Sequence, residues 1–180
     1  VINNVYMESF NFPVDPKIQS EMNEVAIRRG NIIANFAFIE SLISNFVIMH
    51  YIKDEKLVSS FQQDIFEDEF FSYILKFNLF KKVLSKYYTQ DFKKFPIDQF
   101  RQLSKIRNII AHASIVLFAD RKTKKVLTQI MFNHNGEKFN AQEKMDEYDV
   151  LKNKIQPQLQ NLASSLELFN ITMFNEITRD

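Results

Sequence analysis

Apolar residues recur at intervals of three or four along most of the 180-residue chain, which is the spacing of amphipathic α-helices. Proline marks two positions in this pattern. Pro96 suits the first turn of a helix, and Pro157 predicts a kink or a restart within the last one. The pattern therefore predicts four main helices, which span about Lys17–Lys53, Glu67–Tyr88, Pro96–His112 and Gln142–Ile177.

The stretch between the third and fourth helices has a strand-like pattern instead. It contains SIVLFA, KVLTQIMF and EKFNA, which are separated by the turn-rich segments DRKTK and NHNG. Asn135-Gly136 is a strong hairpin signal, because both residue types tolerate a positive φ. We therefore predict a mainly α protein. It is a single domain over residues 1–180, built as a helical bundle with a small β-hairpin inserted at about residues 114–141.

Composition excludes several kinds of chemistry. The chain contains 19 Phe and 2 Gly but no Cys, which removes disulfides, thiolate zinc sites and cysteine nucleophiles. It has no glycine-rich phosphate loop and no nucleophile elbow. The three histidines are scattered, without the His/Asp/Glu cluster that a metal ion needs. We expect no metal and no cofactor, and we interpret His50 as a packing residue and His134 as a turn residue.

Residues 32–52 form the most apolar stretch, which is long enough to cross a membrane. The stretch nevertheless carries Asn35, Glu40, Asn45 and His50, whose polar groups would be costly in hydrocarbon. We therefore predict a helix of a soluble protein that is buried on more than one side. The first residues show no basic region followed by an apolar run, so we expect no signal peptide, no membrane partner and a cytoplasmic location.

Basic residues are concentrated in one part of the chain, although the net charge is only +1. Residues 93–125 contain nine basic and two acidic side chains, and this segment includes the third predicted helix. A basic surface of this kind attracts an anionic partner. Solvated loop lysines are the alternative interpretation, and the charge pattern does not separate the two.

The third predicted helix has one apolar and one polar face. At about 100° per residue, Phe100, Leu103, Ile106 and Ile110 share the buried side. Arg107 lies near the border of that apolar arc. The polar stripe on the other side consists of Arg101, Lys105, Asn108 and His112.

This stripe suits phosphodiester cleavage. That reaction needs a proton acceptor for the nucleophile, a proton donor for the leaving oxygen and a cation for the charged intermediate. Histidine is the side chain whose ordinary pKa serves both proton roles near neutrality. His112 and Arg107 are therefore the candidate acid–base group and the candidate cation, with Asn108 between them in the sequence.

The stretch RNIIAH, from Arg107 to His112, resembles the R-x4–6-H signature of the HEPN superfamily. A polar residue directly after the arginine, here Asn108, is common in that signature, and the earlier stretches FAFIE and FNLFKK are similar to segments of HEPN proteins. The resemblance implies a helical domain that pairs as a homodimer and brings two motifs over one cleft. Many such proteins are metal-independent endoribonucleases, and several are toxins or antiviral effectors, often with an antitoxin encoded by a neighbouring gene.

Carried to this chain, the resemblance implies that His112 acts as general acid or base, that Arg107 holds the phosphate and that Asn108 orients one of them. The ribose 2′-hydroxyl would be the nucleophile, and the products would carry 2′,3′-cyclic phosphate and 5′-hydroxyl ends. We extend this by proposing that basic side chains near the motif follow the RNA backbone. These are Arg101, Lys105, Lys122 and Lys124.

Three alternatives stay open at this level. Glu40 lies in the most apolar helix and needs a partner, so Arg107 would be structural if it paired with Glu40. A HEPN-like protein can also be a non-catalytic module that binds RNA or a nucleotide, or a dimeric scaffold. Finally, a six-residue motif can occur by chance in an ordinary helical bundle.

Overall fold

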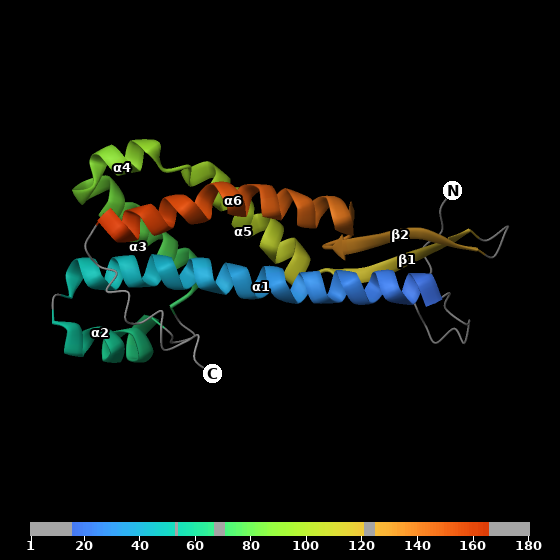
Figure 1. Cartoon of the computed structure of the whole chain (residues 1–180), viewed down its shortest axis with the longest axis horizontal. Coiled ribbons are helices and arrows are strands. Elements are labelled where there is room, and N and C mark those ends of the chain that lie inside the picture. Colours follow the sequence, from blue (N-terminus) through green and yellow to red (C-terminus); the bar gives the residue numbers. More distant parts are fainter. Residues whose placement is uncertain (1–15, 53, 67–70, 121–124, 166–180) are drawn as a thin grey trace. The chain divides into compact units, whose positions relative to one another are not determined.

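The computed structural model describes residues 16–52, 54–66, 71–120 and 125–165. In this part of the chain, six α-helices precede or flank a small three-stranded sheet (Figure 1). This confirms the predicted mainly α fold with a small sheet before the last helix. The elements are α1 (Pro16–Tyr51), α2 (Glu55–Phe61), a π-helical segment (Gln62–Phe66), α3 (Tyr73–Tyr87), α4 (Thr89–Lys94), α5 (Ile97–His112), β1 (Ser114–Asp120), β2 (Lys125–His134), β3 (Glu137–Asn140) and α6 (Ala141–Ser165).

The long helices follow the predicted periodicity closely. α1 matches the first predicted helix, and α5 begins directly after Pro96 and ends at His112. α6 continues through Pro157, so the alternative of a restart at this proline is wrong. Asn140 starts α6 by accepting a hydrogen bond from the backbone N–H of Glu143 at 3.1 Å. The predicted end of this helix, near Ile177, lies outside the described residues.

The second predicted helix is shorter than expected. α3 begins at Tyr73 rather than at Glu67, and residues 67–70 are not described. Before it, α2 is capped by Asp54, whose side chain accepts a hydrogen bond from the backbone N–H of Lys56 at 3.0 Å. α2 and α4 were not predicted, because helices of seven and six residues are too short to show a periodic pattern.

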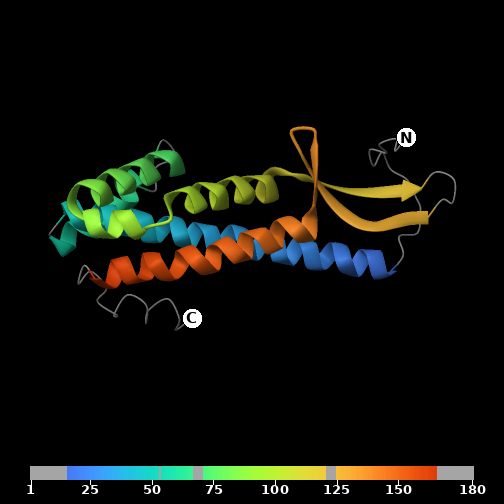
Figure 2. The same ribbon diagram turned by 90° about the horizontal axis from the view of Figure 1, so that it is seen from above.

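The sheet is an antiparallel meander in the order β1-β2-β3. Its second turn is the predicted one, because Asn135 and Gly136 have φ angles of 53° and 83° and connect β2 to β3 through a two-residue loop. The three strands β1, β2 and β3 correspond to the three strand-like stretches predicted between the third and fourth helices. Figure 2 shows that α5 leads directly into β1, and that the short β3 leads directly into α6.

The described chain divides into two compact units. Unit 1 comprises the residues up to Phe36 together with Asp98–Lys152, and unit 2 comprises Ala37–Ile97 together with the residues from Asn153 onward. The single-domain organisation stays a prediction. The core of unit 1 takes buried side chains from α1, α5, β2 and α6, among them Ile32, Phe36, Phe100, Leu103, Ile110, Phe132, Met145 and Tyr148.

In unit 2, aromatic rings make up much of the core, which accounts for part of the high phenylalanine content. Phe80 packs edge-on against Phe46 at 5.2 Å and against Phe95 at 5.3 Å between ring centroids. The His50 ring lies among tyrosine rings, and its Nδ1 is 3.2 Å from the Tyr88 hydroxyl. This environment agrees with the interpretation of His50 as a packing residue.

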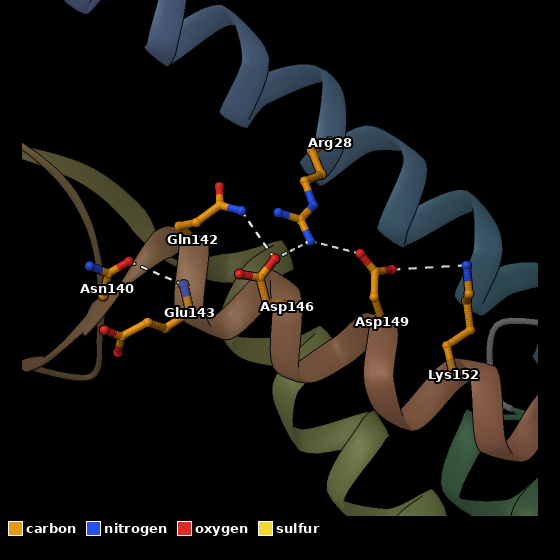
Figure 3. Close-up of polar contacts among 7 residues, drawn as sticks. All are labelled: Arg28, Asn140, Gln142, Glu143, Asp146, Asp149 and Lys152. Atoms are coloured by element: carbon orange, nitrogen blue, oxygen red, sulfur yellow. Dashed lines mark hydrogen bonds and ion pairs between the residues drawn. The ribbon is translucent and has the colours of Figure 1, made fainter.

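Polar contacts in unit 1 hold α1 against the first half of α6. Arg28 donates hydrogen bonds to Asp146 at 2.6 Å and to Asp149 at 2.7 Å, and Lys152 lies 3.9 Å from Asp149 (Figure 3). Burial lowers the pKa of Arg28, but the hydrogen bonds and charges of the two carboxylates outweigh it and raise that pKa overall. The Tyr148 hydroxyl donates to the backbone carbonyl of Ile32 at 3.3 Å.

By length and composition α1 could cross a membrane, and half of its most apolar 18-residue window is buried inside the structure. Within unit 1 the buried side chains of α1 include Ile32 and Phe36, and within unit 2 they include Ile39 and Ile43. A core helix of a soluble protein uses its apolar residues in this way. The structure is therefore compatible with a soluble protein.

Replacing Tyr148 with Phe is expected to lower the free energy of unfolding by about 1 kcal/mol at neutral pH, because a buried hydrogen bond to Ile32 is lost. Burial raises the pKa of Tyr148 above its usual value. The stabilisation by Tyr148 is therefore fully present below about pH 10. It is lost as pH rises further, because the Tyr148 hydroxyl ionises in the unfolded chain before it ionises in the folded protein. Urea denaturation at neutral and alkaline pH measures both effects, and an equal loss of stability in both proteins above pH 10 would contradict the pH dependence.

Candidate functional site on helix α5

The two faces of α5 are those predicted from its periodicity. Phe100, Leu103, Ile106 and Ile110 are at most 3% exposed. The predicted polar stripe is exposed along its whole length, at Arg101, Lys105, Asn108 and His112. His112 is the last residue of the helix, directly before buried Ala113 and the start of β1. The candidate acid–base group is thus open to solvent at the junction of a helix and a strand.

Arg107 lies at the border of the two faces and is half-buried. Its Nη1 donates a hydrogen bond to Oδ1 of Asn108 at 3.1 Å. Its guanidinium carbon lies 5.2 Å from the centroid of the Phe36 ring of α1, within the range of a cation–π contact. Asn108 and His112 are one helical turn apart on the same face. Asn108 therefore draws the off-stripe arginine toward the polar stripe that ends in His112.

In the described part of the chain, the guanidinium of Arg107 does not use all of its hydrogen-bond donors. Its Nε is buried and has no hydrogen-bond partner among the described residues. Arg107 also lies close enough to the buried Tyr148 for its charge to lower the pKa of that hydroxyl, against the larger raising effect of burial. Arg107 thus packs against the ring of Phe36.

Glu40 has a different partner from the expected one. Its carboxylate binds the Nζ of Lys76, on α3, at 2.7 Å within unit 2. Both side chains are largely buried, with exposures of 24% and 13%, so each needs the opposite charge. The expectation that Arg107 pairs with Glu40 is therefore corrected. Periodicity places Glu40 on an apolar helix but does not tell which cation the fold brings to it.

Replacing Glu40 with Gln is expected to lower the free energy of unfolding by about 1–2 kcal/mol, because a largely buried ammonium at Lys76 loses its counter-charge. Urea denaturation measures the effect. Combining Glu40→Gln with Lys76→Met should recover part of the loss, since the unpaired charge is then removed. Additive losses in the double variant would show that the pair does not contribute.

Arg29 of α1 was not identified from the sequence, although it reaches the end of α5. Its Nη2 donates to the carbonyl of Ala111, and its Nη1 donates to the carbonyl of Ala113 at 3.2 Å. These two carbonyls flank His112 in the chain. Only the tertiary structure brings Arg29 to this position, because the contact joins residues 82 and 84 positions apart.

Comparisons with protein-family models, with curated proteins and with solved structures find no match to this chain. The chemistry of the site therefore has to be inferred from its own residues. Among the described residues, no group of three or more His, Asp or Glu side chains could hold a metal ion.

The candidate RNA-binding residues are described only in part. Arg101 is exposed and lies 3.5 Å from Asp98, one turn earlier on α5. Lys105 is exposed on the same face. Lys122 and Lys124 lie outside the described residues. The described part of the proposed RNA surface is therefore the outer face of α5.

A pocket of about 390 Å³ lies in unit 1, and another of about 330 Å³ lies in unit 2. The first is lined by residues that include Glu21, Glu24 and Arg28, and the second by residues that include Glu40 and Lys76. Neither lining includes a residue of the RNIIAH motif. Asn108 and His112 instead lie on the exposed face of α5, which suits a polymer better than an enclosed small molecule.

Proposed function

We propose that this protein is a metal-independent endoribonuclease of HEPN type. The observation that carries the proposal is the hydrogen bond from Arg107 Nη1 to Asn108 Oδ1, on a helix whose exposed face ends in His112. It brings a cation, an amide and an imidazole to one short segment of α5. These are the groups that phosphodiester cleavage requires.

In the proposed reaction, a histidine takes the proton of the ribose 2′-hydroxyl, whose oxygen attacks the adjacent phosphorus. The bond from phosphorus to the 5′-oxygen breaks, and a protonated histidine gives its proton to that leaving oxygen. His112 supplies these proton transfers. Arg107 binds the non-bridging phosphate oxygens, and Asn108 holds Arg107 toward the stripe. The products are a 2′,3′-cyclic phosphate and a 5′-hydroxyl.

Two further parts of the proposal concern assembly and cellular role. We propose a homodimer, in which two α5 motifs contribute their histidines and arginines to one cleft. Lys105 and Arg101, which are exposed on the motif face, bind neighbouring phosphates. A cytoplasmic toxin or defence effector, neutralised by an antitoxin from a neighbouring gene, is the cellular role that we propose for this ribonuclease.

The proposal is tested by incubating the purified chain with end-labelled single-stranded RNA in EDTA. Cleavage is expected, with product masses that correspond to cyclic phosphates. A matched oligonucleotide of the same sequence with 2′-O-methyl groups should stay intact, because it lacks the nucleophile. Cleavage that requires an added metal ion, or that also occurs on the 2′-O-methyl strand, would contradict the mechanism. Binding of RNA without cleavage would instead favour the non-catalytic HEPN-like module.

Sedimentation of the same protein tests the dimer. A species of twice the chain mass is expected at the concentrations at which the protein cleaves RNA. A monomer at all concentrations would remove the shared cleft from the proposal, because one α5 then has to supply both proton-transfer groups by itself.

A further inference from the structure

The guanidinium of Arg29 holds the backbone on both sides of His112. One nitrogen donates to the carbonyl of Ala111, and the other donates to the carbonyl of Ala113 at 3.2 Å. The Ala111 carbonyl belongs to the peptide group that carries the N–H of His112. A single side chain from α1 therefore donates hydrogen bonds to the backbone immediately before His112 and immediately after it.

These contacts occur where the backbone needs them. The last carbonyls of a helix have no partner within the helix, and helix ends fray when those groups are left to water. The N–H of Ala113 closes the final turn by donating to the carbonyl of Ile109 at 2.9 Å. Arg29 supplies hydrogen bonds to two further carbonyls, those of Ala111 and Ala113, and β1 begins at the next residue, Ser114.

His112 depends on this support because its own side chain is exposed. Packing does not restrict the imidazole of an exposed residue, so its direction follows mainly from the backbone that carries it. A proton-transfer group has to be held within about 0.5 Å of its productive position. A misplacement of about 1 Å can cost a factor of about 100 in rate.

We propose that Arg29 is a positioning residue for His112, an inference that rests on the proposed ribonuclease function. Arg29 acts through the peptide groups of Ala111 and Ala113 and does not bind RNA. Both of its terminal nitrogens already donate to carbonyls, and the side chain is half-buried. The planar fork of arginine is suited to two acceptors at once, whereas the ammonium of lysine is a single point of charge.

Single-turnover cleavage of RNA by Arg29→Ala is the first test. The rate at saturating protein is expected to fall about 10- to 100-fold, while the concentration needed for half-saturation changes less than about threefold. Arg29→Lys should recover part of the rate, because it can reach one carbonyl but not both. A defect limited to the half-saturating concentration, with a weaker salt dependence, would overturn the proposal and identify Arg29 as an RNA contact.

Arg28→Ala is the matched control. It removes the same side chain from the neighbouring position of α1 and breaks the ion pairs to Asp146 and Asp149 on α6. Its stability should fall as much as that of Arg29→Ala, or more, but its saturating cleavage rate should equal that of the wild type. An equal loss of rate in both variants would assign the effect to general destabilisation and overturn the positioning role.

Amide hydrogen exchange supplies a readout that does not depend on RNA cleavage. In Arg29→Ala, the N–H of Ala113 is expected to exchange at least about tenfold faster than in the wild type, because the final turn of α5 frays. Arg28→Ala should leave this rate unchanged. If the wild type cleaves no RNA, the proposed function fails, and the exchange still decides whether Arg29 holds the end of α5. Unchanged exchange in Arg29→Ala would overturn the inference in either case.

Discussion

Replacing His112 with Ala is expected to reduce RNA cleavage in EDTA by about 10²- to 10⁴-fold, which is the usual contribution of a general acid–base group. The imidazole is exposed at the end of α5, one turn after Asn108, which holds Arg107. Removing it takes away the proton acceptor for the 2′-hydroxyl and the donor for the leaving oxygen. The measurement is the single-turnover rate at saturating protein, where weaker binding does not lower the rate.

His134→Ala is the matched control for this variant. His134 ends β2, lies in the same unit and is a half-buried histidine, with its ring 3.4 Å from the Asn135 side-chain nitrogen. It is not part of the motif, so its variant should cleave RNA at the wild-type rate. A His112→Ala protein that folds normally and still cleaves at the wild-type rate would exclude His112 from the reaction. Such a result would also point to a contaminating ribonuclease.

Replacing Arg107 with Ala is expected to lower the saturating cleavage rate by about 10²- to 10³-fold. The variant lacks the cation that stabilises the charged intermediate. Arg107→Lys keeps the charge but loses the planar guanidinium, with its contact to Phe36 and its hydrogen bond to Asn108. Its cleavage rate should therefore lie between the rates of the wild type and of Arg107→Ala.

Arg28→Ala again serves as the control. It also removes one arginine from unit 1, but Arg28 pairs with Asp146 and Asp149 rather than with residues of the motif. A loss in Arg107→Ala that disappears after correction for unfolded protein would make this arginine structural. The contact of Arg107 with the Phe36 ring would account for such a structural role. Urea denaturation must therefore accompany the rate measurement. Full activity in a folded Arg107→Ala protein would remove the phosphate-binding role.

Sequence reasoning succeeded where local rules decide the structure. Hydrophobic periodicity identified the buried and exposed faces of α5, because a helix converts spacing directly into direction. Asn135-Gly136 identified the hairpin turn, because its φ angles are set by the two residues themselves. Periodicity failed for α2 and α4, which contain too few turns to show a pattern. It also failed for the start of α3, where the apolar spacing continued upstream of Tyr73.

The candidate site shows the same division. The sequence identified Arg107, Asn108 and His112 and the exposed face that carries two of them, because all three lie within six residues of one helix. It did not identify the contact of Arg107 with Phe36, nor the pairing of Glu40 with Lys76. Those contacts join different helices, and periodicity says which side of a helix is buried but not which residues lie opposite.

The sequence by itself therefore determined the long helices α1 and α5, the hairpin turn and the polar stripe of α5, since these follow from interactions between near neighbours in the chain. Tertiary structure alone decided that Arg107 packs over the Phe36 ring, and that Arg29 reaches the carbonyls on either side of His112. The physical reason is distance along the chain. Arg29 and Ala113 are 84 positions apart, and only the packing of α1 against α5 within unit 1 brings them within a hydrogen bond of each other.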